Sequence, residues 1–380
     1  MATLGGASEE IDRQVLKRYS IEQKLGKGAY GIVWRAEDKK TKEIVALKKI
    51  FDAFQNGTDA QRTYREIIFL QQMQGHENIV MLQKVLRADN DLDIYLVFEY
   101  METDLHATIR ANILEEVHKQ YIIYQSFKAL MYMHSAKLVH RDMKPANLLL
   151  NSECLMKVAD FGLARSLIDN QDEESKAVEK PVLTDYVATR WYRAPEILAG
   201  SQTYGTAVDL WSLGCIFGEM LGGKPVFAGT STLNQFEKIV EVLGMPNEKQ
   251  TESLQSAFAQ TMLESLNLEE RKQKSKAEQK EAWRVKYPNT SDDALDLLTD
   301  LMRFDPTERI TAKAGLTHPY CAQFHDAESE IEARREVSVS TTAPMPEGKA
   351  EKTVNVPDNC KKSTGFYRET LYYMIRKNKK

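Results

Sequence analysis

One short polar stretch of the chain carries several side chains that could move a proton or bind a phosphate. VHRDMKPANLLL contains His140, Arg141, Asp142, Lys144 and Asn147, with apolar runs on both sides, which predicts a loop held between strands. Phosphoryl transfer from ATP needs positioning, charge neutralisation and a carboxylate close to the attacking hydroxyl. We expect Asp142 to be that carboxylate, Lys144 to neutralise the γ-phosphate, and Asn147 to offer a neutral oxygen to Mg²⁺.

A second carboxylate follows in VADFGLAR, thirteen residues after Asn147. Asp160 offers hard oxygen ligands of the kind that Mg²⁺ prefers in proteins. We therefore expect Asp160 and Asn147 to bind the metal. A DFG triplet alone has little weight, and its order and spacing after the loop that contains Asp142 provide the argument.

Three glycines recur near the start of the chain, in LGKGAYGIV, at Gly26, Gly28 and Gly31. The spacing alone fits a dinucleotide-binding loop, a kinase or an ordinary hairpin. A dinucleotide-binding loop runs directly into a helix, whereas IVWRAED follows here and predicts a strand. Because glycine lets a backbone lie close to phosphates, we favour a lid over a nucleotide.

A lysine inside an apolar strand is the next candidate. Lys48 lies in VALKK, seventeen residues after Gly31, and neighbours on a strand face opposite ways, so either Lys48 or Lys49 points towards the glycines. We assign that direction to Lys48 and interpret Lys49 as a surface lysine whose ammonium reaches water. Glu66 is the expected counter-charge of Lys48, although taken alone it would be an ordinary exposed helix carboxylate.

The elements that must position these residues fall into two regions. Residues 19–100 are rich in predicted strands, with one helix in AQRTYREIIFLQQM, and from about Asp104 the apolar pattern becomes helical. We predict an α+β, bilobal fold with a small strand-rich lobe over residues 19–100 and a larger helical lobe over residues 101–324. Residues 1–18 are predicted to be a flexible tail. Residues 325–380 are predicted to form an extended arm and a short terminal helix that packs back on the core.

The composition argues against several other classes of protein. The chain has 380 residues, a net charge of −4 and four cysteines without a CxxC pair. This charge does not favour nucleic acid or a membrane surface as partner, and no apolar run approaches the roughly 20 residues of a membrane helix. We expect reduced thiols, a cytoplasmic or nuclear protein, and a monomer.

Together, these motifs have the order and spacing of the protein-kinase signature set. The set is completed by Ala194-Pro-Glu196. On these motifs, the chain resembles a eukaryotic protein kinase over residues 19 to about 324. The resemblance implies ATP in a cleft, with Phe98 at its back, backbone groups of Glu99 and Met101 on adenine, and Asp104 near the ribose. It also implies that Asp209 braces the catalytic loop and that Arg309 pairs with Glu196. The full set of expected ATP contacts is Leu25, Gly26, Lys27, Gly28, Ala29, Tyr30, Gly31, Val33, Ala46, Lys48, Phe98, Glu99, Met101 and Asp104.

Further stretches narrow the resemblance to mitogen-activated protein kinases. They are YMETDLHATIR, HRDMKPANLLL and TDYVATRWYRAPEIL, while LGKGAYGIVW and KKIFDAFQNGTDAQRT resemble the atypical seven/eight-type branch of the extracellular signal-regulated kinases. Thr184 and Tyr186 flank Asp185 as the family's dual phosphorylation motif does, although most animal members carry Glu at the middle position. Met143 and Ala146 stand where Leu and Ser are usual, and neither contributes a phosphate ligand.

The resemblance implies a phosphorylation switch. Each phosphate adds about −1.5 to −2 charge, so arginines are the expected partners. Arg62 and Arg65 lie on the predicted helix of Glu66, and capture of a phosphate there could also seat the Lys48–Glu66 pair. The candidate cradle is Arg62, Arg65, Arg141 and Arg165 for phospho-Thr184, with Arg190 for phospho-Tyr186.

Substrates and partners are also implied by the family. Protein substrates should carry Ser or Thr followed by Pro. Asp326 and Glu330 in HPYCAQFHDAESEIE are candidates for a docking patch that binds basic-hydrophobic peptides, and a merely solvated acidic stretch is the alternative. A pseudokinase that only binds partners is disfavoured because Lys48, Asp142 and Asp160 are all present. The spacing of Thr184 and Tyr186 speaks against a cyclin-dependent relative.

Overall fold

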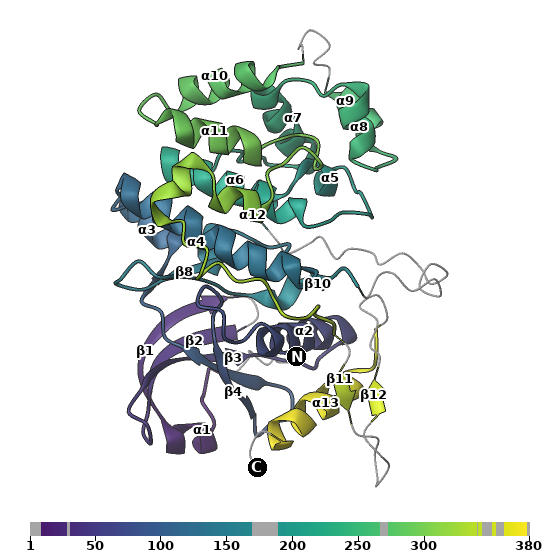
Figure 1. Ribbon diagram of the computed structural model, residues 1–380. Helices are drawn as coiled ribbons and strands as arrows, with labels where there is room; N and C mark the ends of the chain where they lie inside the picture. Colours follow the sequence, from purple (N-terminus) through teal and green to yellow (C-terminus); the bar gives the residue numbers. More distant parts are fainter. Residues whose placement is uncertain are drawn as a thin grey trace, which may run out of the picture. The chain divides into compact units, whose positions relative to one another are not determined.

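The computed structural model divides the chain into two compact units. The first unit combines Met1–Glu102, Asp160–Lys180 and Val337–Lys380, and the second combines Thr103–Ala159 and Pro181–Glu336. Within them the structure describes residues 9–28, 31–168, 189–266, 273–339, 341–343, 352–354 and 361–377. The first unit is rich in strands and the second is mostly helical, which confirms the predicted α+β class with a strand-rich part and a helical part (Figure 1).

A five-stranded antiparallel sheet forms the first unit, in the order β1-β2-β3-β5-β4. Buried and half-buried residues alternate along β2 and β3, as expected for a sheet whose two faces differ. Lys48 lies opposite Val33 on β2 and Leu96 on β5. The strands are β1 (Tyr19–Gly28), β2 (Gly31–Asp38), β3 (Ile44–Ile50), β4 (Leu82–Arg87) and β5 (Ile94–Glu99).

Helix α1 (Arg13–Arg18) lies in the segment that was predicted to be a flexible tail, so that prediction is wrong for these residues. Val15 is 2% exposed and joins a core cluster with Tyr19, Leu47 and Val97. The preceding Asp12 accepts hydrogen bonds from the hydroxyl of Tyr95 and from a backbone N–H. Val15 in the core cluster and Ile11 packed against it anchor the segment, which composition alone did not indicate.

Helix α2 (Gly57–Gln72) carries the predicted partner of Lys48. The Asn56 side chain caps it by accepting from the backbone N–H groups of Thr58 and Asp59, which satisfies two otherwise unpaired donors. Most of the helix is buried, from Ala60 to Leu70.

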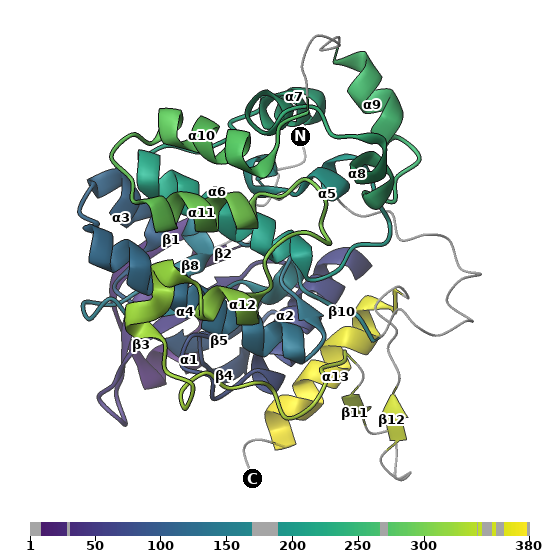
Figure 2. The ribbon, with the colours of Figure 1, turned by 45° about the horizontal axis from the view of Figure 1, so that its top comes forward.

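Two parts of the C-terminal extension pack on α2. The predicted terminal helix is present as α13 (Thr364–Lys377), which contacts α2 and β4 (Figure 2). Further upstream, the hydroxyl of Tyr64 donates to the carbonyl of Val339 at 3.2 Å, and the Gln72 amide bonds the backbone of Ser338. The extension also contains a hairpin of β11 (Thr341–Ala343) and β12 (Lys352–Val354).

The second unit is built around α4 (Glu116–Ser135) and α6 (Ala207–Gly222), both largely buried. Helix α6 also packs closely against Met302: a Cβ added at Gly214 would lie 2.6 Å from the sulfur of that residue. A small sheet in the order β6-β8-β9 flanks the catalytic loop. Its strands are β6 (Thr103–Asp104), β8 (Leu148–Leu150) and β9 (Met156–Val158). The remaining helices of the described chain are α3 (Leu105–Ala111), α5 (Pro195–Leu198), α7 (Thr232–Leu243), α8 (Glu248–Ser253), α9 (Ala259–Ser265), α10 (Lys276–Lys286), α11 (Asp292–Leu301) and α12 (Ala312–Leu316).

Short elements place most of the motif residues. In the first unit, η2 (Phe161–Leu163) and β10 (Arg165–Ser166) follow Asp160. In the second, β7 (Leu138–Val139) and η1 (Pro145–Asn147) bound the catalytic loop, η4 (Arg190–Tyr192) precedes Ala194-Pro-Glu196, and η5 (Pro319–Phe324) follows α12. Among the described residues, no helix has the length and apolar character to span a bilayer.

Candidate active site

Lys48 and Glu66 form an ion pair inside the first unit. The Nζ of Lys48 lies 2.6 Å from Oε1 of Glu66, whose side chain is 6% exposed. Burial lowers the pKa of Lys48, but the carboxylates of Glu66 and Asp160 outweigh it, so the net pKa is raised. Lys48 is therefore held in its charged form at neutral pH, which suits binding of anionic phosphates.

The side chains beside Lys48 leave one face of the sheet half-exposed. Val33 and Ala46 lie on this face, whereas Val45 and Leu47 alternate onto the buried one. Lys49 also lies on the buried face: it is 2% exposed, and its Nζ bonds the carbonyl of Glu10 at 2.8 Å and Asp93 at 3.2 Å. The interpretation of Lys49 as a surface lysine is therefore wrong, because a buried carboxylate and the N-terminal segment supply its partners.

The glycine hairpin has two kinds of glycine. A Cβ at Gly31 would lie 2.1 Å from the carbonyl oxygen of Lys49, so the sheet itself requires this glycine. A Cβ at Gly26 or Gly28 would meet nothing within 4 Å, which leaves their backbone open to close approach by a phosphate. Leu25 is 40% exposed, and Lys27 pairs with Glu9 at 2.7 Å. Ala29 and Tyr30 lie outside the described residues.

The residues expected to contact adenine and ribose lie at the end of β5 and beyond. Phe98 and Met101 are nearly buried, at 9% and 8% exposure. The N–H of Glu99 donates to the carbonyl of Met81 at 3.2 Å, so this N–H is already engaged within the first unit. Asp104 belongs to the second unit, where its Oδ1 accepts from the N–H of Ala107 and caps α3.

The catalytic loop of the second unit brings three predicted residues together. Lys144 Nζ lies 2.7 Å from Oδ2 of Asp142, which is 7% exposed. The Asn147 amide donates to the carbonyl of Asp142 at 2.8 Å and to its Oδ2 at 3.2 Å. Since the Nδ2 of Asn147 points at Asp142, its Oδ1 is the atom left to bind a cation.

Asp209 on α6 fixes the backbone of this loop through hydrogen bonds. The fully buried carboxylate accepts from the N–H groups of His140 and Arg141, at 2.9 and 2.8 Å, and contacts His134 Nε2 at 3.0 Å. Burial raises the pKa of Asp209, but the bonds from His134 and the loop outweigh it and the net pKa is lowered. Arg141 is thereby held at a φ of 69°. Sequence reasoning missed His134, which lies in the last turn of α4.

Asp160 lies in the first unit in a left-handed conformation, with φ 63° and ψ 73°. Its Oδ1 accepts from the N–H of Gly162 at 3.4 Å, and its Oδ2 lies 3.7 Å from Nη2 of Arg62. The partly exposed carboxylate of Asp160 in the first unit and the amide oxygen of Asn147 in the second are each hard donors of the kind that divalent cations such as Mg²⁺ prefer.

The anchor after the predicted phosphorylation loop is a buried pair in the second unit. Arg309 bonds Glu196 through two parallel contacts of 2.6 and 2.7 Å. The side chains are 0% and 3% exposed, and further Arg309 donors reach the carbonyls of Arg303 and Phe304. This is the bidentate geometry that makes arginine the preferred partner of a buried carboxylate.

The predicted phosphate-binding arginines are divided between the units. Arg62, Arg65 and Arg165 lie in the first unit, where Arg65 is buried and Arg165 donates to the carbonyl of Ala164. Arg141 and Arg190 lie in the second. Arg141 stacks over Tyr204 at 5.2 Å, and its buried Nη1 has no hydrogen-bond partner, while Arg190 reaches the carbonyl of Thr230. Thr184 and Tyr186 lie outside the described residues.

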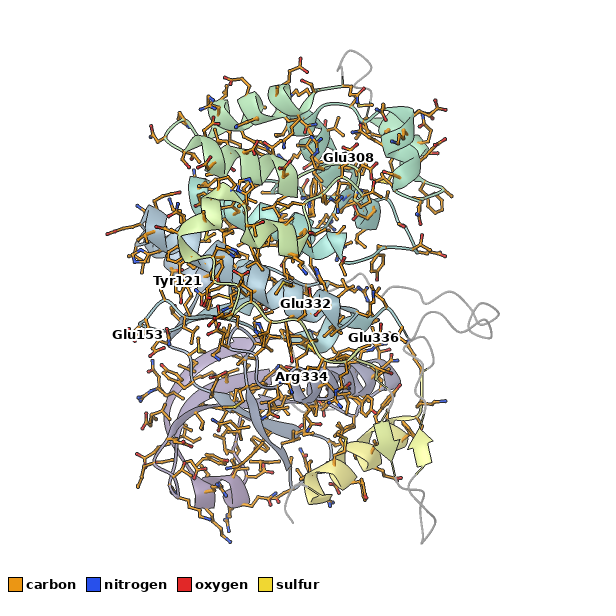
Figure 3. All side chains as sticks on the ribbon, viewed as in Figure 1. Tyr121, Glu153, Glu308, Glu332, Arg334 and Glu336 are labelled. Atoms are coloured by element: carbon orange, nitrogen blue, oxygen red, sulfur yellow. The ribbon has the colours of Figure 1, made fainter. Side chains whose placement is uncertain are left out.

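The predicted docking patch is wrong for Glu330. Its Oε1 accepts from the hydroxyl of Tyr124 and the N–H of Asp326, both at 3.0 Å, and contacts His325 Nδ1 at 2.8 Å. The side chain is 8% exposed, because it closes the extension onto α4. Asp326 and Glu328 remain exposed. Figure 3 labels Glu332, Arg334 and Glu336 on the segment that follows.

A cluster of Asp296, Asp300 and His318 has ligand types that could hold a metal. Lys276 already lies 2.5 Å from Asp300, and Lys280 lies 3.6 Å from Asp296. The Nδ1 of His318 accepts from a backbone N–H, so in the neutral ring its Nε2 carries the proton and cannot be a ligand. We therefore assign this cluster to ion pairing.

Comparisons with known proteins agree with these motifs. The protein kinase domain family matches residues 19–321. Extracellular signal-regulated kinase 2 of Dictyostelium discoideum is 56% identical over 98% of this chain and 94% of its own length. Mitogen-activated protein kinase 15 of Caenorhabditis elegans is 43% identical over 98% of this chain and 74% of its own. The Xenopus laevis protein of that name is 47% identical, and the match covers 59% of its length.

Proposed function

Because the chain belongs to the protein kinase family and is a serine/threonine kinase of the mitogen-activated type, we propose that it phosphorylates Ser or Thr followed by Pro in protein substrates, with Mg²⁺ as its metal. The cluster of Asp142, Lys144 and Asn147 is the observation that carries the phosphoryl transfer in this proposal. It joins a carboxylate, a cation and a neutral oxygen donor within one short loop, as phosphoryl transfer requires.

Each residue has a chemical task that its contacts support. The carboxylate of Asp142 orients the substrate hydroxyl and accepts its proton. Lys144 and Lys48 neutralise the charge of the transferred and remaining phosphates, and Glu66 keeps Lys48 in place. Protein kinases use ATP and a divalent metal; bound Mg²⁺ would supply charge neutralisation, and Asp160 and Asn147 would hold it.

The proposed regulation is phosphorylation of Thr184 and Tyr186, by an upstream kinase or by the protein itself. The support is the T-x-Y spacing and the arginines with donors suited to phosphate, of which Arg141 has a buried Nη1 without a partner. The proposed preference for proline rests on the family resemblance around residues 187–190.

We further propose that basic-hydrophobic peptides dock near Asp326. The exposed carboxylates of Asp326 and Glu328 support this, and Glu330 takes no part because it is bonded internally. We propose that the protein acts as a monomer in the cytoplasm or the nucleus.

A peptide assay tests the central proposal. The phosphorylated protein should transfer phosphate to a Ser-Pro peptide much faster than to the same peptide with Ala after Ser. Asp142→Ala should abolish transfer while its thermal unfolding stays close to that of the parent. Equal rates on both peptides would refute the proline preference, and full activity of Asp142→Ala would refute the assigned role of this carboxylate.

A further inference from the structure

Three charged side chains of the first unit lie around Asp160, the predicted metal ligand. Lys48 pairs with Glu66 at 2.6 Å, and Arg62 pairs with Asp160 at 3.7 Å. Arg62 and Glu66 lie one helical turn apart on α2 and so share a face. The helix therefore supplies both the carboxylate that holds Lys48 and a cation that contacts Asp160.

The seat of Arg62 is formed by the local backbone. A Cβ added at Gly162 would lie 2.7 Å from Nε and 3.0 Å from Cγ of Arg62. Glycine at this position therefore leaves the space that the arginine side chain occupies. The left-handed conformation of Asp160 turns its carboxylate so that one oxygen accepts from the N–H of Gly162 and the other faces the guanidinium.

We propose that Arg62 competes with the divalent metal for Asp160 when Thr184 is not phosphorylated. A guanidinium and a divalent cation seek the same carboxylate oxygens, so Asp160 cannot satisfy both in full. The side chains of Arg62 and Asp160 are 23% and 29% exposed, so the competition is screened but present.

The same residue belongs to the arginine set proposed for a phosphate on Thr184, and this part of the inference rests on the proposed function. A phosphate carries more charge than a carboxylate and offers more acceptor oxygens. Phosphorylation would draw Arg62 towards the phosphate and leave Asp160 to the metal. Arg62 would then serve two anions in turn, first the metal ligand and later the phosphate.

Metal binding tests the first half without any catalytic readout. The background is Thr184→Ala with Tyr186→Phe, and the probe is Mn²⁺ with a non-hydrolysable ATP analogue, followed by the electron paramagnetic resonance signal of unbound Mn²⁺. Arg62→Gln should lower the Mn²⁺ dissociation constant about threefold, the size expected for a partly exposed ion pair. An unchanged or raised constant would overturn the proposal.

The matched control is Arg87→Gln, which removes one positive charge from the same unit but breaks an exposed pair with Asp91. It should leave the Mn²⁺ dissociation constant unchanged. If Arg87→Gln lowers this constant as much as Arg62→Gln does, the effect comes from net charge alone and the proposal is overturned. If Arg62→Gln unfolds early on heating, Arg62→Lys replaces it, with a smaller gain expected.

The second half is tested with chain phosphorylated at Thr184. It should bind Mn²⁺ as tightly as the unphosphorylated Arg62→Gln variant, and Arg62→Gln should add nothing further. If the variant still gains when phosphorylated, the exchange of partners is wrong while the competition stands. Failure of the proposed activation would appear separately, as equal kinase rates with and without the phosphate.

Discussion

Tyr64 in α2 and Tyr367 in α13 pack with their ring centroids 5.3 Å apart, and both side chains are fully buried. The hydroxyl of Tyr367 also accepts a hydrogen bond from the N–H of Lys362. Since α2 carries Glu66, the C-terminal helix supports the element that positions the Lys48–Glu66 pair.

Tyr367→Ala should destabilise the first unit by about 3 kcal/mol, because it removes a large buried side chain and leaves a cavity against Tyr64. Tyr367→Phe keeps the ring contact and removes the hydroxyl that accepts from Lys362, so a smaller loss of about 1 kcal/mol is expected. Urea unfolding of the full chain measures both. Equal losses in the two variants would contradict a role for the ring packing.

Arg309→Met should cost about 3–5 kcal/mol, because it leaves the carboxylate of Glu196 buried without its cation. The control is Lys313→Met, which breaks the exposed pair with Glu332 and should change stability by less than about 1 kcal/mol. Thermal unfolding compares the two variants. A loss at Arg309 no larger than that at Lys313 would count against the anchor.

Acid should weaken the first unit through Asp38. Burial raises the pKa of Asp38, but the N–H of Lys40, the guanidinium of Arg18 and the ammonium of Lys84 outweigh it and lower the pKa to about 2. A lowered folded-state pKa gives stability that is present above the ordinary value of 3.8 and is lost as the pH falls towards 2.

The variant Asp38→Asn should therefore cost about 1–2 kcal/mol at pH 6 and progressively less below pH 4. Asp292→Asn is the control, since the side chain of Asp292 is 66% exposed. It should change the free energy of unfolding little at any pH tested. Urea unfolding at pH 6, 4 and 3 provides the test. A loss at Asp38 that does not depend on pH would show that its charge is not responsible.

Thr184→Ala with Tyr186→Phe should lower the rate on a Ser-Pro peptide at least about tenfold, because no phosphate would order the arginines. An unchanged rate would refute the switch. Mass spectrometry of protein made in bacteria, where no upstream activator is present, separates the two routes of activation. Phosphate on both residues of the parent but not of Asp142→Ala would indicate autophosphorylation.

Asp326→Asn should weaken a basic-hydrophobic docking peptide, and added salt should weaken the parent's binding in the same way. Glu330→Gln should instead lower stability, because its carboxylate bonds Tyr124 and His325 inside the second unit. Fluorescence anisotropy with a labelled peptide, together with thermal unfolding, separates the two effects. Peptide binding that is insensitive to Asp326→Asn and to salt would leave the segment as solvated surface.

Residues whose partners lie close in sequence were predictable. The loop of Asp142, Lys144 and Asn147 forms its hydrogen bonds within six residues, so its spacing already carried the chemistry. The Lys48–Glu66 pair was predictable because strand alternation limited the choice to two lysines.

The missed residues depend on partners far away in the chain. Lys49 is buried only because Asp93 and Glu10 approach it. Glu330 looked like a surface charge, and its burial depends on Tyr124. Neither propensity nor periodicity carries information on such long-range neighbours, whereas the terminal helix was predicted and is present as α13.

The first unit is assembled from three separate stretches of the chain, and this has a consequence for synthesis on the ribosome. Its sheet and α2 are made early, whereas Val337–Val339 and α13 are made last. A nascent chain that has emerged beyond Glu196 contains every residue assigned to catalysis. The side of α2 that later packs against Tyr367 is then still exposed to solvent. A stop codon shortly after residue 336 would thus release a polypeptide that contains all the residues assigned to catalysis but lacks the segments that cover α2. Because the apolar surface of α2 would be exposed, chaperones and proteases should recognise this product.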